Sequence, residues 1–532
     1  MIDDRNEPAE GGESYNFVAN VIARWRDETP DATALHWTDG QSKVRLGFAD
    51  LYERARRAAA VLEQCGVRRG DVVMVLLSRE LPWWELMLGC LRLGALPSPA
   101  TVQLGVSEIA YRVEASDARA IIANERCASR VEEAALPAGV ARLIVGGPRA
   151  GWRFYDDLAA ELSLDDATDE IVPSTAGEDA LCYFTSGTTG YPKMTIHRHD
   201  YPLGHRVTGL EWLALQPGDT CWNLADTGWA KAAWSSLFAP WLAGATIFSY
   251  QADSFDARTV LDLLSRMPVT TLCAPPTAYR MMLQENLDRY RFPALRRCVA
   301  AGEPLGEDAM VAWKEATGLD LAVGYGQTET GLLCADLLGA EIRPGAMGRP
   351  VPGITLTTIN DDGQELPPGT EGDLALLASP DRPAGLFKEY RDDPERTAAT
   401  RRGDWYLTGD RAVRDDDGYL WFVGRADDVI LSSGYRIGPF EVESALNAHP
   451  AVMESAVVSS PDPTRGEIVK AFVILAPKWT ASDELARMLQ DHVKASTAPY
   501  KYPRSIAFVA SLPKTVSGKI LRRELRDAEW KK

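Results

Sequence analysis

The sequence lacks the short motifs of several common enzyme classes. It contains no Gly-x-Ser-x-Gly, which excludes the nucleophile elbow of a thioesterase or lipase, and no Gly-x-Gly-x-x-Gly, which argues against a dehydrogenase. None of its eight cysteines forms a Cys-x-x-Cys pair, so we expect reduced thiols. His197, His199 and His205 lack the i, i+4 spacing and the partner ligands of a zinc site, which predicts structural or surface histidines.

Positive charge is scarce and unevenly spread. The chain has 57 Lys and Arg against 75 Asp and Glu, a formal net charge of −18, so it should repel nucleic acids and anionic membrane surfaces. Residues 428–532 depart from this balance, with 15 Lys and Arg against 12 Asp and Glu. Because this part has no run of Lys or Arg, a nucleic-acid tail is disfavoured, and a lid over an anionic ligand fits better.

Signals for export or membrane insertion are also missing. Residues 1–14 are acidic and polar, without the basic and apolar regions of a secretory signal, which favours a cytoplasmic location. Residues 232–252 carry no charge and are long enough to span a bilayer, but they contain Pro240, Gly244 and three serines. We therefore expect a buried helix, a turn and a strand there, and no integral membrane association.

The pattern of apolar residues predicts an α/β fold. The 532 residues are 45% hydrophobic and 25% charged, as in a globular protein with a large core. Residues 48–64 have helical spacing, Gly66 breaks the pattern, and an apolar run follows at 72–77. Further units are expected as a helix at 83–93 and as strands at 120–123 and 143–145. Such alternation predicts a parallel sheet with helices on both faces.

The pattern changes twice toward the C-terminus. Between 345 and 425, short β-like runs separated by Asp-Asp-Gly and Pro-Pro-Gly turns predict a small β subdomain. From Asp428 onward, mixed helices and strands predict a compact α+β domain. We therefore divide the chain into a large N-terminal domain of parallel-sheet α/β subdomains, residues 1–426, and a small C-terminal domain, residues 427–532, with a binding cleft between them.

The strongest local motif is Thr185-Ser-Gly-Thr-Thr-Gly-Tyr-Pro-Lys193, which follows an apolar run. Glycines let backbone N–H groups face a polyphosphate, hydroxyls add donors, and Lys193 adds charge. The motif is not a Walker A loop, because Lys193 follows Pro192 rather than glycine and is followed by Met194. On this motif alone, a loop that is merely flexible is the alternative interpretation.

Later motifs decide between these interpretations. They are Gly302-Glu-Pro304, Tyr325-Gly-Gln-Thr-Glu329, Thr408-Gly-Asp410, Gly424-Arg-Ala-Asp-Asp428, Ser433-Gly-Tyr-Arg-Ile437 and Pro513-Lys-Thr-Val-Ser-Gly-Lys519. Together with the first motif, they resemble the series of the adenylate-forming acyl-CoA synthetase superfamily over essentially the whole chain. Residues 432–439, 460–467 and 498–503 resemble the medium-chain acyl-CoA synthetase branch in particular. The resemblance implies a small C-terminal lid domain that moves about a hinge at Asp427.

The resemblance also implies catalytic residues, namely Lys519, Lys193, Thr328 and Glu329. Attack of a carboxylate on the α-phosphorus of ATP brings anions together, so cations and donors are needed more than an acid/base pair. Lys519 would reach the carboxylate and the α-phosphate, Thr328 would touch the α-phosphate, and Glu329 would bind Mg²⁺. Without the resemblance, Lys519 would be a solvated lysine, and Gln327 to Thr330 could cap a helix.

The ATP and AMP site would include further residues. They are Thr185, Ser186, Gly187, Thr188, Thr189, Gly190, Gly302, Glu303, Pro304, Gly324, Tyr325, Gly326, Gln327, Asp410, Arg425 and Arg436. Asp410 would accept hydrogen bonds from the ribose hydroxyls, although a turn aspartate is the plain alternative. Arg425 would share the ribose and phosphate site, and Tyr325 would stack on adenine.

The coenzyme A and acyl sites are expected at other positions. Candidates for coenzyme A are Gln103, Ser433, Gly434, Tyr435, Arg465, Tyr500 and Lys501, and Arg436 would add charge for its phosphates. Trp229, with Gly324, would line the acyl pocket. As an alternative to the hinge role, Asp427 could be an exposed aspartate paired with a neighbouring arginine.

The function implied is that of an ATP-dependent acid-CoA ligase. The reaction would use ATP, Mg²⁺ and coenzyme A, and its substrate would be a medium-chain fatty or small aromatic carboxylic acid. One alternative is an adenylating enzyme that loads a carrier protein, and another is a non-catalytic acyl or nucleotide sensor. Monomer and homodimer both remain open.

Overall fold

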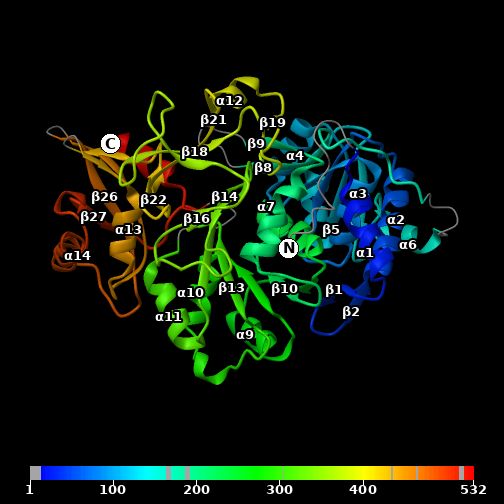
Figure 1. The fold of residues 1–532 in the computed structure, drawn as a ribbon, viewed down its shortest axis with the longest axis horizontal. Helices are drawn as coiled ribbons and strands as arrows, with labels where there is room; N and C mark the ends of the chain where they lie inside the picture. The colour runs from blue at the N-terminus through cyan, green and yellow to red at the C-terminus, as the bar shows by residue number, and fades with distance from the viewer. Residues whose placement is uncertain are drawn as a thin grey trace.

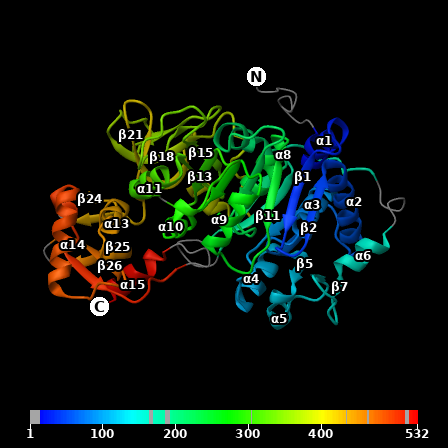
Figure 2. The same ribbon diagram turned by 90° about the horizontal axis from the view of Figure 1, so that it is seen from below.

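The fold is described from a computed structural model covering residues 14–162, 169–185, 192–303, 305–432, 435–462, 465–514 and 520–531. Figures 1 and 2 show an elongated molecule in which the N-terminal elements, blue to cyan, lie at one end and the C-terminal elements, orange to red, at the other. The green strands of the largest sheet lie between these ends. This arrangement leaves a boundary between the largest sheet and the C-terminal elements, where the site described below is found.

A five-stranded parallel sheet forms near the N-terminal end. Its strand order is β4 (Leu96–Pro99), β3 (Val72–Leu76), β5 (Ala118–Asn124), β6 (Ala141–Val145) and β7 (Arg153–Phe154). Its helices are α2 (Phe48–Gln64), α3 (Pro82–Leu93), α4 (Val106–Ser116), α5 (Glu125–Glu133) and α6 (Tyr155–Glu161). A Cβ atom at Gly89 would lie 2.8 Å from the Ala58 Cβ, so glycine lets α2 and α3 pack closely. The predicted parallel sheet is confirmed.

A nine-stranded sheet forms the centre of the molecule. Its strand order is β16 (Arg349–Pro350), β15 (Gly331–Ala335), β14 (Leu321–Gln327), β13 (Arg297–Ala301), β12 (Thr271–Ala274), β10 (Thr220–Asn223), β11 (Thr246–Tyr250), β1 (Thr33–Thr38) and β2 (Lys43–Gly47). The strands from β14 to β1 pair in parallel, and β15, β16 and β2 run antiparallel to their neighbours. Because carboxyl ends of parallel strands share one edge, side chains from several strands meet there.

Helices and short turns cover this sheet. The helices are η2 (Val18–Ile22), α1 (Ala23–Glu28), η3 (Tyr201–His205), η4 (Thr208–Trp212), α9 (Ala257–Arg266), α10 (Pro276–Leu283), η6 (Leu287–Arg289) and α11 (Glu307–Thr317). The uncharged segment 232–252 forms α7 (Ala230–Ala233), η5 (Trp234–Phe238), α8 (Ala239–Leu242), a turn at Gly244 and β11. The prediction of buried helix, turn and strand is thus confirmed. Within the described ranges, no helix has both the length and the apolar character needed to cross a membrane.

Two smaller antiparallel sheets complete the large domain. One has the order β19 (Glu389–Tyr390), β9 (Lys193–Arg198) and β8 (Asp179–Thr185). The other joins β17 (Leu356–Ile359), β18 (Glu371–Leu377), β21 (Trp405–Arg414) and β20 (Arg401–Arg402), and β22 (Leu420–Arg425) pairs with β21. Helix α12 (Pro394–Ala399) lies between β19 and β20 in the chain. These β17–β22 strands supply the short β-like runs predicted between 345 and 425.

The small C-terminal domain has its own core. Its sheet has the order β24 (Tyr435–Ile437), β23 (Ile430–Ser432), β26 (Gly466–Leu475) and β25 (Val452–Asp462), and β27 (Ser505–Phe508) pairs with β26. Its helices are α13 (Pro439–Asn447), α14 (Asp483–Ser496), η7 (Pro499–Lys501) and α15 (Arg522–Trp530). Ile430, Val442, Leu446, Val457 and Leu489 share one buried cluster. The predicted α+β character is confirmed.

Candidate active site

A large cavity opens at the carboxyl edge of the nine-stranded sheet, with a volume of about 2890 Å³. Both domains line it, since Phe440 and Arg522 of the C-terminal domain face the same space as Trp229 and Glu329 of the large domain. The predicted site residues that line it are Gln103, Thr185, Lys193, Trp229, Gly302, Glu303, Gly324, Tyr325, Gly326, Gln327, Thr328, Glu329, Asp410, Arg425 and Asp427. Residues scattered over more than 300 sequence positions therefore meet in one cleft.

Several predicted residues lie outside the described part of the chain. They are Ser186, Gly187, Thr188, Thr189, Gly190, Pro304, Ser433, Gly434 and Lys519. The ends of the predicted phosphate loop are described, because Thr185 ends β8 and pairs with Lys193, which begins β9. Lys514 and Ile520 form a β-bridge on either side of the segment containing Lys519, and both line the cavity.

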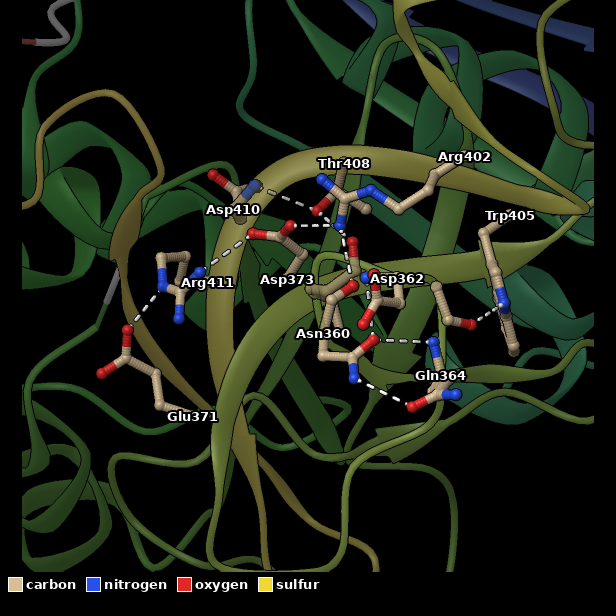
Figure 3. A network of polar contacts seen from close by, with 12 residues as sticks. Asn360, Asp362, Gln364, Glu371, Asp373, Arg402, Trp405, Thr408, Asp410 and Arg411 are labelled. Atoms are coloured by element: carbon tan, nitrogen blue, oxygen red, sulfur yellow. Dashed lines mark hydrogen bonds and ion pairs between the residues drawn. The ribbon is translucent and has the colours of Figure 1, made fainter.

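Asp410 is the centre of a polar cluster on β21 and is 4% exposed. Its Oδ2 accepts hydrogen bonds from the hydroxyl of Tyr325 and from Nε2 of Gln327 at 3.0 Å, and its Oδ1 accepts one from Nη1 of Arg425 at 3.1 Å. Its own N–H donates to Thr408 Oγ1 at 3.1 Å, as Figure 3 shows. Asp410 lies within a strand, so the alternative of a turn aspartate is wrong.

Burial and neighbouring charges fix the protonation states of Tyr325 and Arg425 in this cluster. Burial and the neighbouring Asp410 carboxylate raise the pKa of Tyr325, so its phenol remains a donor. Burial opposes the charge of Arg425, but the carboxylates of Asp410 and Asp427 outweigh it and raise the pKa of Arg425. The result is a rigid acceptor beside a permanent cation, which suits binding of a diol next to a phosphate.

Lys193 and Glu329 approach each other through a third residue, Tyr390. Nζ of Lys193 donates to the Tyr390 hydroxyl at 3.1 Å, and that hydroxyl donates to Oε1 of Glu329 at 2.8 Å. Burial lowers the pKa of Lys193, and the nearby Glu329 carboxylate partly offsets this. The sequence reasoning missed Tyr390, which lies 197 positions from Lys193, because only the pairing of β19 with β9 brings the two together.

Thr328 and Glu329 occupy the turn between β14 and β15. The N–H of Gln327 donates to Thr330 Oγ1 at 3.0 Å, and the N–H of Phe387 donates to the Glu329 carbonyl at 2.6 Å. The alternative of a helix cap for this segment is wrong, because the chain continues as an antiparallel hairpin instead. The turn points Thr328 and Glu329 into the cavity.

Further residues lie beside the predicted acyl wall at Trp229. Trp222, Trp234 and Lys231 also line the cavity, and Nζ of Lys231 donates to the carbonyl of Ala301 at 2.5 Å, beside Gly302. Lys231 could have been found from the sequence, because it is a single charged residue directly before the uncharged segment 232–252. Glu303 also lines the cavity, where its carboxylate accepts hydrogen bonds from Thr277 and Arg280.

The coenzyme A candidates divide into two groups. Gln103 is exposed and lines the cavity, whereas Arg465, Tyr500 and Lys501 do not line it. Lys501 forms an ion pair with Glu441 within the C-terminal domain. Tyr435 and Arg436 form β24 together with Ile437. Among the candidates whose side chains the structure describes, Gln103 of the large domain therefore does not share one site with Arg465, Tyr500 and Lys501 of the small domain.

Asp427 lies in the turn that joins β22 to β23, where the two domains meet. Its carbonyl accepts a hydrogen bond from Nη1 of Arg526 at 2.6 Å, and its carboxylate lies 3.5 Å from Nε of Arg425. These contacts match the alternative predicted from the sequence, an exposed aspartate paired with an arginine. The hinge role stays a prediction.

The histidine segment is structural. His197 and His205 are fully buried and His199 is 2% exposed, and burial lowers the pKa of His197 and His205 to about 3 and of His199 to about 4. Among the residues that the structure describes, no three His, Cys, Asp or Glu side chains gather as a metal site. All eight cysteines are buried and unbridged, in agreement with the prediction of free thiols.

Comparison with known proteins identifies the family. Residues 22–390 match the model of the AMP-binding enzyme family, and residues 441–519 match that of the AMP-binding enzyme C-terminal domain. The chain therefore belongs to the AMP-binding enzyme family. The predicted resemblance to the medium-chain acyl-CoA synthetase branch of the adenylate-forming superfamily is also confirmed.

Individual relatives match over nearly the whole chain. Acyl-coenzyme A synthetase ACSM4, mitochondrial, of Homo sapiens is 48% identical over 97% of this chain and 91% of its own length. The structure of the anthranilate CoA ligase AuaEII in complex with anthranoyl-AMP superimposes with a TM-score of 0.88, at 32% identity, over 97% of this chain and 98% of that chain. A benzoate CoA ligase from Burkholderia xenovorans gives a TM-score of 0.84 at 28% identity, over 96% and 100%.

Proposed function

We propose that this chain is an AMP-forming acid-CoA ligase. In the first half-reaction, a carboxylate oxygen of the acid bonds to the α-phosphorus of ATP, and the bond to pyrophosphate breaks. In the second, the thiolate of coenzyme A bonds to the acyl carbon of the acyl-adenylate, and AMP leaves with the electron pair. The observation that carries this proposal is the convergence of Lys193, Glu329, Asp410 and Arg425 on one cavity lined by both domains.

The chemistry of the first half-reaction fits these residues. Carboxylate and triphosphate repel each other, so the site must offer cations and hydrogen-bond donors at fixed positions. Arg425 and Lys193 supply charge, and Asp410 supplies an acceptor for the ribose. Thr328 is assigned to the α-phosphate and Tyr325 to the adenine, and the resemblance assigns Lys519 to the carboxylate and α-phosphate.

Glu329 is assigned as the protein ligand of Mg²⁺. A magnesium ion is usually held by one or two carboxylates together with phosphate oxygens and water, rather than by a cluster of protein ligands. The single carboxylate of Glu329 at the cavity wall fits this donor set. When bound, Mg²⁺ neutralises phosphate charge.

The acid is assigned to the medium-chain fatty or small aromatic carboxylates. Trp222, Trp229 and Trp234 give the cavity an apolar aromatic wall beside Gly324. A Cβ atom at Gly324 would lie 2.7 Å from the Trp212 ring, so the backbone approaches the indole more closely than any other residue would allow. Related proteins named for anthranilate and benzoate support an aromatic acid, and the relatives named ACSM support an acyl chain.

Coenzyme A binding is assigned to Gln103 in the large domain and to Ser433, Gly434, Tyr435, Arg465, Tyr500 and Lys501 in the small domain. Because Gln103 lines the cavity and the described residues Arg465, Tyr500 and Lys501 do not, we propose that residues 427–532 rotate about Asp427 between the half-reactions. Arg436 is assigned to the nucleotide phosphates.

The predicted cytoplasmic location is kept as a proposal. The curated relatives carry the word mitochondrial in their names, so a mitochondrial location is the alternative. Subcellular fractionation with an antibody to the native protein tests it, and co-sedimentation with mitochondria would overturn it.

The decisive test is a panel of carboxylic acids incubated with ATP, Mg²⁺ and coenzyme A. Pyrophosphate and AMP release are followed separately from thioester formation. We expect thioester only from the parent, with Lys519→Ala losing about 10²-fold or more of adenylate formation. Adenylate without thioester would favour a carrier-loading enzyme, and no turnover with any acid would favour a sensor.

A further inference from the structure

Tyr390 joins two charged residues of opposite sign that come from separate elements. Lys193 begins β9, Glu329 lies in the turn after β14, and Tyr390 ends β19. The phenol oxygen lies 3.1 Å from Nζ of Lys193 and 2.8 Å from Oε1 of Glu329. All three residues line the cavity.

The direction of each hydrogen bond follows from chemistry. An ammonium group can only donate, so Tyr390 accepts from Lys193, and its one proton goes to the Glu329 carboxylate. Burial and the Glu329 charge raise the pKa of Tyr390, which keeps that proton on the phenol. One phenol can engage at most one N–H of Lys193 and one oxygen of Glu329. Each charged group therefore retains other atoms with which to bind a ligand.

The phenol itself is held firmly. Tyr390 is 4% exposed, pairs with Thr195 across the ladder, and donates its N–H to Thr397 Oγ1 at 3.0 Å. Its ring packs on Phe387 with centroids 4.8 Å apart, and Nζ of Lys193 lies 4.2 Å from the Tyr390 ring centroid. The hydroxyl is thus a fixed point between the Lys193 ammonium and the Glu329 carboxylate, whose side chains have more rotatable bonds than tyrosine.

We propose that Tyr390 is a positioning residue for adenylate formation, whose hydroxyl holds the Lys193 ammonium and the Glu329 carboxylate in fixed positions at the cavity wall. This inference rests on the proposed ligase function and on the roles given there to Lys193 and Glu329. Pyrophosphate leaves at the end of the first half-reaction. Tyr390 therefore acts on adenylate formation and not on thioester formation.

Tyr390→Phe tests this directly, because it removes the hydroxyl and keeps the ring that packs on Phe387 and faces Lys193. We expect adenylate formation to slow about 10- to 100-fold, as for a small misplacement of reacting groups. The Mg²⁺ concentration for half-maximal rate should rise severalfold. Thioester formation from supplied acyl-adenylate and coenzyme A should stay within about twofold of the parent, since no triphosphate takes part.

Tyr419→Phe is the matched control. Tyr419 is also buried, and its hydroxyl donates to the Glu341 carbonyl at 2.6 Å, away from the residues that line the cavity. We expect it to lose a similar amount of thermal stability and to keep parental kinetics and Mg²⁺ dependence.

Each result decides a separate question. An inactive parent would overturn the ligase function before Tyr390 is tested. An active parent with unchanged adenylate formation and Mg²⁺ dependence in Tyr390→Phe would overturn the positioning role. Equal loss in both half-reactions, with a melting temperature well below that of Tyr419→Phe, would show a merely structural role and overturn it as well.

Discussion

Among single residues, Asp336 combines deep burial with a position behind the cavity. It is 1% exposed, and Val323, which lines the cavity, donates its N–H to Oδ2 of Asp336 at 2.9 Å. Burial raises the pKa of Asp336 to about 7, although that hydrogen bond and Arg297 act against the shift. Near neutral pH, this buried carboxyl behind β14 therefore titrates.

Asp336→Asn should become more stable relative to the parent as pH rises. The folded pKa lies above the unfolded value of 3.8, so the parent has this group's full stabilisation below pH 4 and loses it as pH rises through about 7. Asparagine cannot ionise and keeps an oxygen for the Val323 N–H. We expect the difference in free energy of unfolding to shift by up to about 4 kcal/mol between pH 4 and pH 8. Urea unfolding at several pH values measures it, and a constant difference would contradict it; exposed Asp361→Asn is the control.

At the scale of secondary-structure elements, ion pairs hold the strand that carries Asp410. Asp373 on β18 accepts from Nη1 of Arg402 at 2.6 Å and from Nη1 of Arg411 at 3.1 Å, and Nε of Arg411 donates to Glu371 at 2.5 Å. Figure 3 shows these side chains joining neighbouring strands. Because side chains alternate along β21, Arg411 faces this network while Thr408 and Asp410 face inward.

The β14–β15 hairpin depends on a close backbone contact at Gly326. A Cβ atom there would lie 1.8 Å from the Gly331 carbonyl oxygen, so Gly326→Ala must displace the hairpin and the turn that carries Thr328 and Glu329. We expect a loss of about 1–3 kcal/mol in stability, measured by chemical unfolding, together with slower adenylate formation. Gly177→Ala, where a Cβ atom meets nothing within 4 Å, should change stability by no more than about 0.5 kcal/mol. Equal effects of the two substitutions would contradict this account.

At the scale of the whole molecule, an acidic body meets a slightly basic C-terminal domain at a short turn. Arg425 and Arg526 contact Asp427 from the two sides of this junction. The cavity lies across the junction, so any movement of one domain relative to the other changes which side chains face it. A reaction with two chemically different steps can use such a change.

Asp427→Pro should separate the two half-reactions. Proline fixes φ near −65°, so a rotation about residue 427 becomes costly. We expect near-parental pyrophosphate release in a single turnover and thioester formation slowed by about tenfold or more. Asp427→Ala, which keeps backbone freedom, should retain both steps. Rapid thioester formation by Asp427→Pro would contradict a hinge at this position.

Much of the fold could be predicted from sequence because its signals are local. The helix expected at residues 48–64 is α2 with the same ends, and the strand expected at 72–77 is β3. The alternative of a helix cap at Gln327 to Thr330 was wrong, because a short polar segment can close a hairpin as readily as it caps a helix. The pairing of β14 with β15 makes this segment a hairpin turn.

By itself, the sequence determined much of the element order, the family and a set of polar and aromatic residues that line the cavity, because apolar periodicity and motif spacing are properties of neighbouring residues. Only the tertiary structure decided which distant side chains form hydrogen bonds and which charged groups are buried. Tyr390 meets Lys193 and Glu329 through a strand pairing, and Asp336 acquires its raised pKa through burial behind Val323. Hydrogen-bond partners and desolvation depend on what the fold places around a group, and residue order alone does not specify them.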